Sequence, residues 1–217
     1  MKTEVFIKKE IDNIISLLIE LGLCDDQNFT SITESNGIAC VTFDKSLNLS
    51  IPLKNIEYDK IYDELVKDRQ YTMKLADGNL IQLMYEIQEN NVISHRLTMF
   101  PSKHLESFQN EPEFYVSDCI YADILKKNVV AFPIRFDFSV QEKPEHPFSH
   151  LSLGQFENCR IPVFGPVMPK TFINFILKNF YNTFFVDKGL YNKMKEDYEK
   201  TYTIRENEKK EMHIFVL

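Results

Sequence analysis

The sequence lacks the features that mark several classes of protein. It has only 6 glycines and 9 prolines in 217 residues, which excludes a collagen-like or low-complexity chain. No segment approaches the roughly 20 consecutive apolar residues of a membrane-spanning helix. Acidic residues interrupt the first apolar segment, which argues against a secretory signal. We therefore expect a folded cytoplasmic protein with no membrane partner.

Cysteine is also scarce, because the chain has four cysteines that lie far apart and form no CxxC pair. These are Cys24, Cys40, Cys119 and Cys159, each with apolar or strand-like neighbours. A disulfide or a zinc site is the functional alternative, but dispersed cysteines in such a chain are more often small core residues. We expect all four to be structural.

An excess of positive charge is absent, since the formal net charge is −7. A protein that coats nucleic acid nonspecifically needs many lysines and arginines to neutralise phosphates, so that class is excluded. The charge is nevertheless uneven. Residues 1–110 carry 11 basic and 17 acidic side chains, whereas residues 158–186 contain Arg160, Lys170 and Lys178 and no acid. An acidic chain of this kind can still hold one basic groove.

What the sequence does contain is the composition of a globular protein, with 44% hydrophobic and 26% charged residues. Apolar residues spaced three and four apart predict helices over residues 3–21, 58–70 and 169–184. A further short helix is expected over residues 115–127, after a loop over residues 102–112. The wide apolar stripe of the first helix must pack against another surface.

Alternating apolar and polar residues predict the strands. We expect one or two short strands within residues 25–53 and an antiparallel meander over 71–101, with turns at Asp77-Gly78 and Asn90-Asn91. A strand over 129–140, a hairpin over 151–163 that turns near 155–158, and two strands over 201–205 and 212–217 complete the list. The last of these ties the C-terminus into the sheet.

These elements predict one α+β domain over residues 1–217. Residues 1–70 form a helical N-terminal part. Residues 71–217 form an antiparallel, mostly meander sheet with helices packed on one face. The length suits one sizeable core.

The stretch 135–181 holds the densest set of polar groups that can do chemistry. Arg135 and Asp137 alternate with apolar residues, so we expect both on the polar face of one strand. His150 begins the next strand on the same side, with His146 in the loop that leads into it. Arg160 then emerges on that face from the returning strand. A helical HExxH zinc motif is excluded, because the pattern is that of a strand and the glutamate is missing.

This set of side chains suits two chemistries. Histidine moves protons near neutral pH and arginine presents a planar fork to phosphate, so together they could cleave a phosphodiester without metal. Alternatively, Asp137, His146 and His150 could hold a divalent metal that polarises phosphate or activates water. A third interpretation is structural, with histidines that cap loops and arginines that pair with acids. The spacing leaves all three open.

The helix predicted over 169–184 has a polar stripe of Lys170, Asn174, Lys178 and Asn182, repeated every four residues and free of acids. The functional interpretation is that Lys170 and Lys178 contact a nucleic-acid backbone. The alternative is an ordinary solvated helix face. His95, by contrast, has no partners of this kind in the sequence pattern and is expected to be incidental.

The ordered block RFDFS, HPFSHLSLG, CRIP and FINFILKNFYNT resembles an uncharacterised bacterial family of two-gene anti-phage defence loci, in which the small protein accompanies a helicase. A weaker similarity is to small toxins that have a strand-borne aspartate followed by a histidine-rich strand, although this chain lacks their denser histidine run. The resemblance implies a defence role and a helicase partner, but it supplies no catalytic mechanism.

Together, the residues and the resemblance favour a defence subunit that acts on nucleic acid as a nuclease, through the Asp/His/Arg set. The alternative is a noncatalytic subunit that docks on the helicase. Its acidic N-terminal half favours a protein partner, and the wide stripe of the first helix could extend the interface. An antitoxin-like neutraliser is a third hypothesis.

Overall fold

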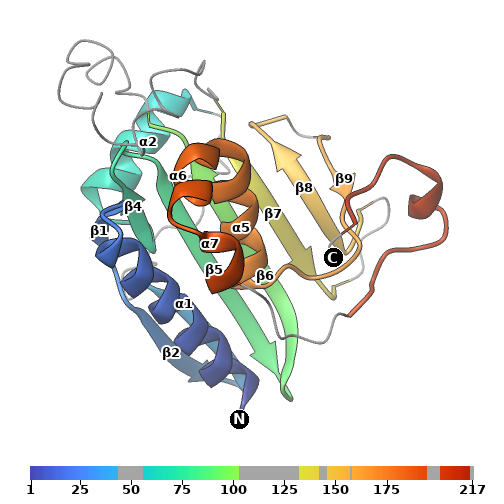
Figure 1. The fold of residues 1–217 in the computed structure, drawn as a ribbon. Helices are drawn as coiled ribbons and strands as arrows, with labels where there is room; N and C mark the ends of the chain where they lie inside the picture. The colour runs from blue at the N-terminus through green and yellow to red at the C-terminus, as the bar shows by residue number, and fades with distance from the viewer. Residues whose placement is uncertain (44–55, 103–131, 142–145, 157, 195–200, 216–217) are drawn as a thin grey trace.

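The computed structural model describes residues 1–43, 56–102, 132–141, 146–156, 158–194 and 201–215, which form an antiparallel sheet with helices against it (Figure 1). The strands are β1 (Cys24–Gln27), β2 (Thr30–Ser35), β3 (Ile38–Phe43), β4 (Met73–Leu75), β5 (Leu80–Gln88), β6 (Asn91–Phe100), β7 (Ile134–Ser139), β8 (Ser149–Leu153) and β9 (Ile161–Pro162). The helices are α1 (Thr3–Glu20), α2 (Tyr58–Lys67), α5 (Pro169–Phe180), α6 (Asn182–Asp187), α7 (Leu190–Lys193) and a 3₁₀ turn, η3 (Glu208–Lys210). The predicted α+β class is confirmed.

The strand order is that of a meander from β4 to β9, with β1 beside β4. The long strand β5 pairs with β6 along one edge, while β4 and β3 share its other edge at successive positions. The pair β2 and β3 therefore joins the same sheet. Where one or two short strands were expected within residues 25–53, the structure has β1, β2 and β3, and the sheet therefore extends beyond residues 71–217 into the N-terminal part.

Helices α1 and α5 pack side by side on one face of this sheet (Figure 1). The apolar stripe of α1 is buried there, with Ile7, Ile11 and Ile15 fully inaccessible to solvent. From the sheet, Phe136 of β7 meets Phe172 and Phe175 of α5 edge-on. The stripe of the first helix therefore belongs to the core, which removes it as a docking surface.

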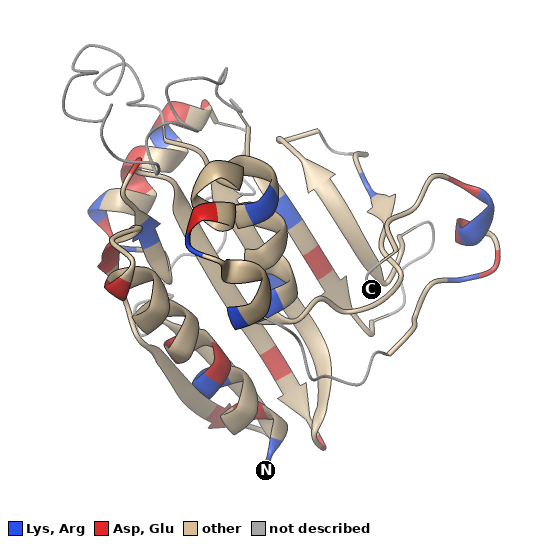
Figure 2. Ribbon diagram, in the orientation of Figure 1, with Lys and Arg blue, Asp and Glu red and all other residues tan. Residues whose placement is uncertain are grey.

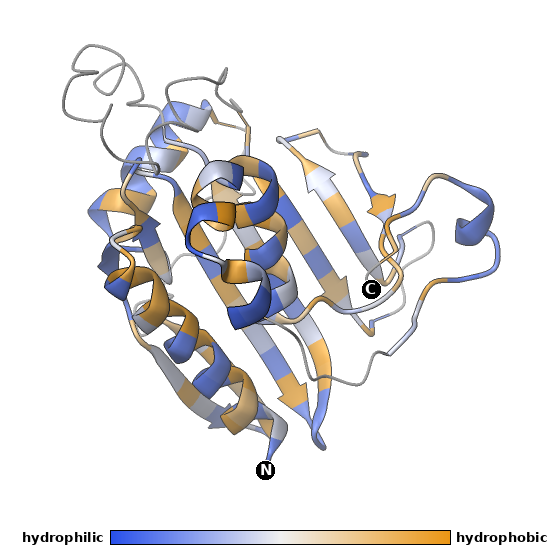
Figure 3. Cartoon of the chain, viewed as in Figure 1, coloured by the Kyte–Doolittle hydropathy of each residue, from blue (hydrophilic) through white to orange (hydrophobic). Residues whose placement is uncertain are grey.

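Helix α2 packs at one end of the opposite face. Leu80 of β5 lies against Ile61 and Leu65 of α2, together with Phe100 of β6, in a second apolar cluster. Ile81, which follows Leu80 in β5, belongs instead to the main core with α1. Successive strand residues face opposite sides, so the two clusters lie on opposite faces of the sheet. The alternating hydropathy of the strands is visible in Figure 3.

The helix predicted over 169–184 is interrupted. It divides into α5 and α6 at Tyr181, whose φ of −129° and ψ of 43° lie outside the helical region. The Tyr181 hydroxyl donates to the Asp77 carboxylate at 2.5 Å and accepts from Asn79 Nδ2 at 2.7 Å. These contacts lie in the buried turn between β4 and β5. A local pattern could not predict the break, because the partners are about 100 residues away in sequence.

The strands predicted over 201–205 and 212–217 are not found in the described residues there. Instead, the chain makes an isolated bridge between Val163 and Ile214, with residues 201–204 against Phe164. The C-terminal segment is thus tied to the sheet edge as expected, but not as a hairpin.

At the β5–β6 turn, the positive-φ residues are Glu89 and Asn90, one position earlier than predicted. The helix expected over 115–127 and nearly all of the loop expected over 102–112 lie outside the described residues.

Candidate functional site

The polar face of three neighbouring strands carries a row of charged side chains. Strand register places Arg96 of β6 opposite Asp137 of β7, and Asp137 opposite His150 of β8. Side chains at directly paired positions point to the same face and lie about 5 Å apart at Cβ. Arg135, two residues before Asp137, shares that face. The predicted placement of Arg135, Asp137 and His150 is confirmed.

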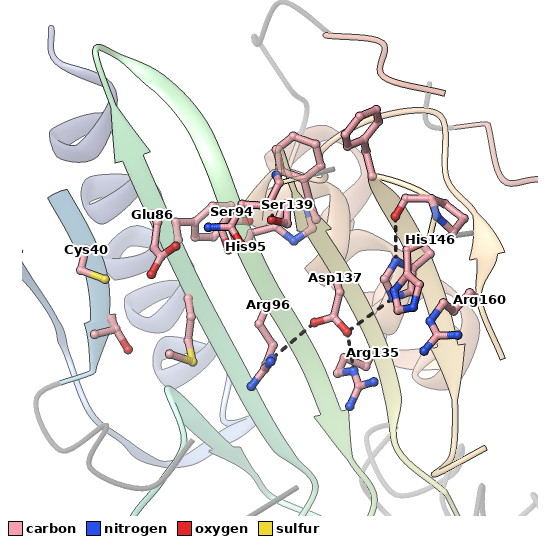
Figure 4. Close-up of a pocket in the computed structure, with 18 residues that line it drawn as sticks. Cys40, Glu86, Ser94, His95, Arg96, Arg135, Asp137, Ser139, His146 and Arg160 are labelled. Atoms are coloured by element: carbon pink, nitrogen blue, oxygen red, sulfur yellow. Dashed lines mark hydrogen bonds and ion pairs between the residues drawn. The ribbon is translucent and has the colours of Figure 1, made fainter. Parts of the chain in front are cut away.

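Asp137 is at the centre of this row (Figure 4). Its Oδ1 accepts a hydrogen bond from Arg96 Nε at 3.3 Å, and its Oδ2 accepts one from Arg135 Nε at 2.6 Å. His150 Nε2 lies 3.8 Å from the same Oδ2. These side chains are only partly accessible to solvent, so their charges interact more strongly than exposed pairs do. Asp137 therefore holds two arginines in place beside a histidine.

His150 is poised to be neutral at physiological pH. Burial lowers the pKa of His150, an effect that the nearby Asp137 carboxylate opposes. Its Nδ1 lies 3.3 Å from the carbonyl oxygen of Pro147. If Nδ1 carries the proton in this contact, Nε2 is the nitrogen with the lone pair, and it lies 3.8 Å from Asp137 Oδ2.

These side chains line an open pocket of about 650 Å³. Its wall includes all of the predicted set of Arg135, Asp137, His146, His150 and Arg160. In Figure 4 the side chains of Arg96, Arg135, Asp137, His146 and Arg160 lie on the side of the sheet away from the helices. The geometry therefore brings together residues that are up to 25 positions apart in the chain, from Arg135 to Arg160.

Arg96 was not predicted from the sequence to lie in this row. Its local pattern is an ordinary strand residue in β6, and nothing in that segment singles it out. Its place beside Asp137 follows from the pairing of β6 with β7, across 41 residues of chain. Only a knowledge of register could have found it.

The predicted nucleic-acid contacts Lys170 and Lys178 are not part of this pocket. They lie on α5, which covers the other face of the sheet (Figure 1) and carries basic residues in Figure 2. Lys170 Nζ is 3.8 Å from Glu10 Oε1 of α1, and Asn174 Nδ2 donates to the Met194 carbonyl oxygen at 2.8 Å. Two members of the polar stripe thus make contacts within the helical layer.

His95 has a defined role in the fold, in contrast to the expectation that it is incidental. It points to the helical face of β6, is 3% exposed, and accepts the backbone N–H of Val167 at Nε2, at 2.8 Å. Burial lowers the pKa of His95 to about 4. A neutral His95 thus fixes the segment that leads into α5.

The alternative in which Asp137, His146 and His150 hold a metal has no support from their arrangement. Among the described residues, no group of three or more His, Cys, Asp or Glu side chains has the proximity needed to bind a metal ion. Both Asp137 oxygens are instead engaged by arginines.

In the same described part of the chain, no helix is long and apolar enough to cross a bilayer.

The chain belongs to the family described as "Uncharacterized conserved protein (DUF2290)", which it matches over residues 23–216. The match includes every strand and the whole pocket. Comparison with curated proteins and comparison with solved structures each give no match. The resemblance to an uncharacterised family is therefore confirmed, while the helicase neighbour stays a prediction.

Proposed function

We propose that this protein is a nuclease that cleaves RNA at the arginine-lined pocket, without a metal ion. We further propose that it acts in the bacterial cytoplasm as the small subunit of an anti-phage defence system, beside a helicase. The observation that carries the catalytic part is the convergence of Arg96, Arg135, Arg160 and two histidines on one open pocket.

The charge of the pocket suits the transition state of phosphoryl transfer. Three arginines, Asp137 and Glu86 leave one positive charge, a protonated His146 adds a second, and a pentavalent phosphorane bears two negative charges. Arg135 binds Asp137 through Nε, so its terminal amino groups remain for a phosphate oxygen. Fixed positive groups of this kind stabilise charge that develops in a reaction without reorganisation.

The two histidines supply the proton transfers. His150 Nε2 removes the proton from the RNA 2′-hydroxyl, whose oxygen attacks phosphorus as the bond to the 5′-oxygen breaks. His146 donates a proton to that leaving oxygen, so the products are a 2′,3′-cyclic phosphate and a 5′-hydroxyl. Asp137, 3.8 Å from His150, stabilises the imidazolium that forms. DNA lacks the 2′-hydroxyl and is not a substrate for this step.

The test incubates purified protein, alone and with the neighbouring helicase, with end-labelled RNA and DNA in EDTA or in magnesium. We expect cleavage of RNA in EDTA and a rate at least about 100-fold lower for His150→Ala. Tyr191→Ala is the control, because Tyr191 is exposed on α7, outside the pocket and away from its face of the sheet. Equal cleavage by wild type and His150→Ala rules out the assignment.

The second hypothesis, a noncatalytic subunit that docks on the helicase, is favoured by the ion pairs of Asp137. Such pairs are also found in purely structural clusters. In that case wild type does not cleave, and His150→Ala binds the helicase and resists phage as well as wild type does. Co-purification and plaque counts with the same two variants separate the hypotheses.

A further inference from the structure

An exposed aromatic cluster lies next to the pocket. The ring of Phe164 meets Tyr202 at a centroid distance of 4.8 Å and Phe215 at 4.5 Å, both steeply tilted. Tyr202 is 58% exposed and Phe215 is 51% exposed, although both belong to an arrangement of packed rings. Single exposed aromatics are common, but two around a shared central ring form a surface that a flat ligand can use.

The backbone holds this cluster in a fixed shape. Phe164 accepts a hydrogen bond from the Thr203 N–H at 3.0 Å and donates one to the Ile214 carbonyl oxygen at 2.9 Å. The next residue, Gly165, is so close to the chain that an added Cβ would lie 2.0 Å from the Thr201 carbonyl oxygen. Three parts of the chain therefore meet at Phe164. The exposed rings of Tyr202 and Phe215 come from the two parts that do not contain Phe164.

The cluster adjoins the strand that carries His150. Pro162 is paired with His150 across β8 and β9, and Phe164 follows two residues later, beyond the end of β9. The chain stays beside β8 there, because the Val163 N–H donates to the Ser149 carbonyl oxygen at 2.9 Å and the Ser149 hydroxyl donates to the Gly165 carbonyl oxygen at 2.7 Å. The segment that carries Tyr202 also reaches the pocket rim, where Arg205 Nη2 donates to the His146 carbonyl oxygen. The guanidinium of Arg205 lies 5.2 Å from the centroid of the Phe148 ring, which lines the pocket.

The C-terminal segment over residues 201–215 has balanced charge, with three basic and three acidic residues. Of the acids in the C-terminal segment, Glu208 pairs with Arg205 at 2.7 Å and Glu206 pairs with Lys209 at 2.6 Å. Glu206 and Glu208 therefore present no unpaired carboxylate to a polyanion that extends from the arginine pocket to the aromatic cluster.

We propose that Phe164, Tyr202 and Phe215 form a stacking platform for an unpaired nucleobase, adjacent to the phosphate that the arginine pocket binds. This inference rests on the proposed function, and it makes single-stranded nucleic acid the substrate class. Bases stack on aromatic side chains with little sequence preference, because each base has a π face. A duplex keeps its bases stacked on each other and cannot use the platform.

The test compares two uncleavable oligonucleotides of equal length and charge, a 2′-O-methyl RNA and the same backbone without bases, by fluorescence anisotropy. Stacking contributes about 1–3 kcal/mol per base, so we expect wild type to bind the base-containing strand about tenfold more tightly. The double variant Tyr202→Ala/Phe215→Ala should bind both strands with the lower affinity. Tyr202→Phe keeps the ring and should keep the preference.

Two further variants separate the possible failures. Arg135→Ala should weaken both strands alike, because it removes a phosphate contact. Tyr191→Ala, which removes an exposed tyrosine on α7, should change neither. Equal binding of both strands by wild type overturns the platform but leaves the phosphate pocket, whereas binding of neither overturns both. If the double variant keeps the preference for the base-containing strand but no longer binds the helicase, the cluster is a protein-docking surface instead.

Discussion

The buried hydroxyl of Tyr181 offers a sharp test of the fold. Tyr181 is 1% exposed, and it donates to Asp77 Oδ2 at 2.5 Å in the turn between β4 and β5. Burial raises the pKa of Asp77 to about 6, and the tyrosine hydrogen bond opposes that rise. Tyr181→Phe removes the hydroxyl but keeps the ring, so the change creates no large cavity.

The cost of this substitution should depend on pH. At pH 8 Asp77 is ionised, and a hydrogen bond to a charged group contributes about 1.5–3 kcal/mol. At pH 5 Asp77 is mostly protonated, and the lost bond is between neutral groups and contributes about 1 kcal/mol. Without the hydroxyl, the pKa of Asp77 in the folded state rises further, so the folded variant binds more protons. Its free energy of unfolding therefore recovers as the pH falls.

The assay is urea unfolding followed by far-UV circular dichroism at pH 8 and pH 5. Tyr191→Phe is the matched control, because Tyr191 is exposed and the loss of its hydroxyl should cost about 0 kcal/mol at either pH. A destabilisation by Tyr181→Phe that is equal at both pH values, or larger at pH 5, would refute the reasoning. Asn79 would then be the only important partner of the carboxylate.

Three other predictions concern stability. Gly165→Ala should cost more than about 2 kcal/mol by thermal melting, because its Cβ would meet backbone, whereas Gly37→Ala has open space and should cost about 1 kcal/mol for its positive φ. Burial lowers the pKa of His95 from 6.5 to about 4, so its contribution to stability is present above pH 6.5 and is lost as the pH falls towards 4. Urea titrations should show that this acid-side loss is smaller in His95→Gln than in wild type, and an unchanged slope would contradict it. Asp137→Asn should lower stability by about 1 kcal/mol, because two arginines lose their shared counter-charge, and an unchanged melting temperature would show that these pairs contribute nothing.

Local sequence pattern was sufficient for most of the elements. The alternation of β7 placed Arg135 and Asp137 together on one face, because side-chain direction along a strand is a property of the backbone. The stripe of α1 likewise predicted a buried helix. The break at Tyr181 and the single bridge from Ile214 to Val163 were not predictable, because both depend on contacts with residues distant in the chain.

The candidate site divides in the same way. The sequence by itself determined which residues of β7 and β8 face the polar side, since strand periodicity requires only neighbouring residues. The tertiary structure decided that Arg96 joins them, that Lys170 lies on the other face, and that an aromatic cluster adjoins the pocket. Register between strands and the face that a helix covers are set by packing across the whole core, and no local segment records them.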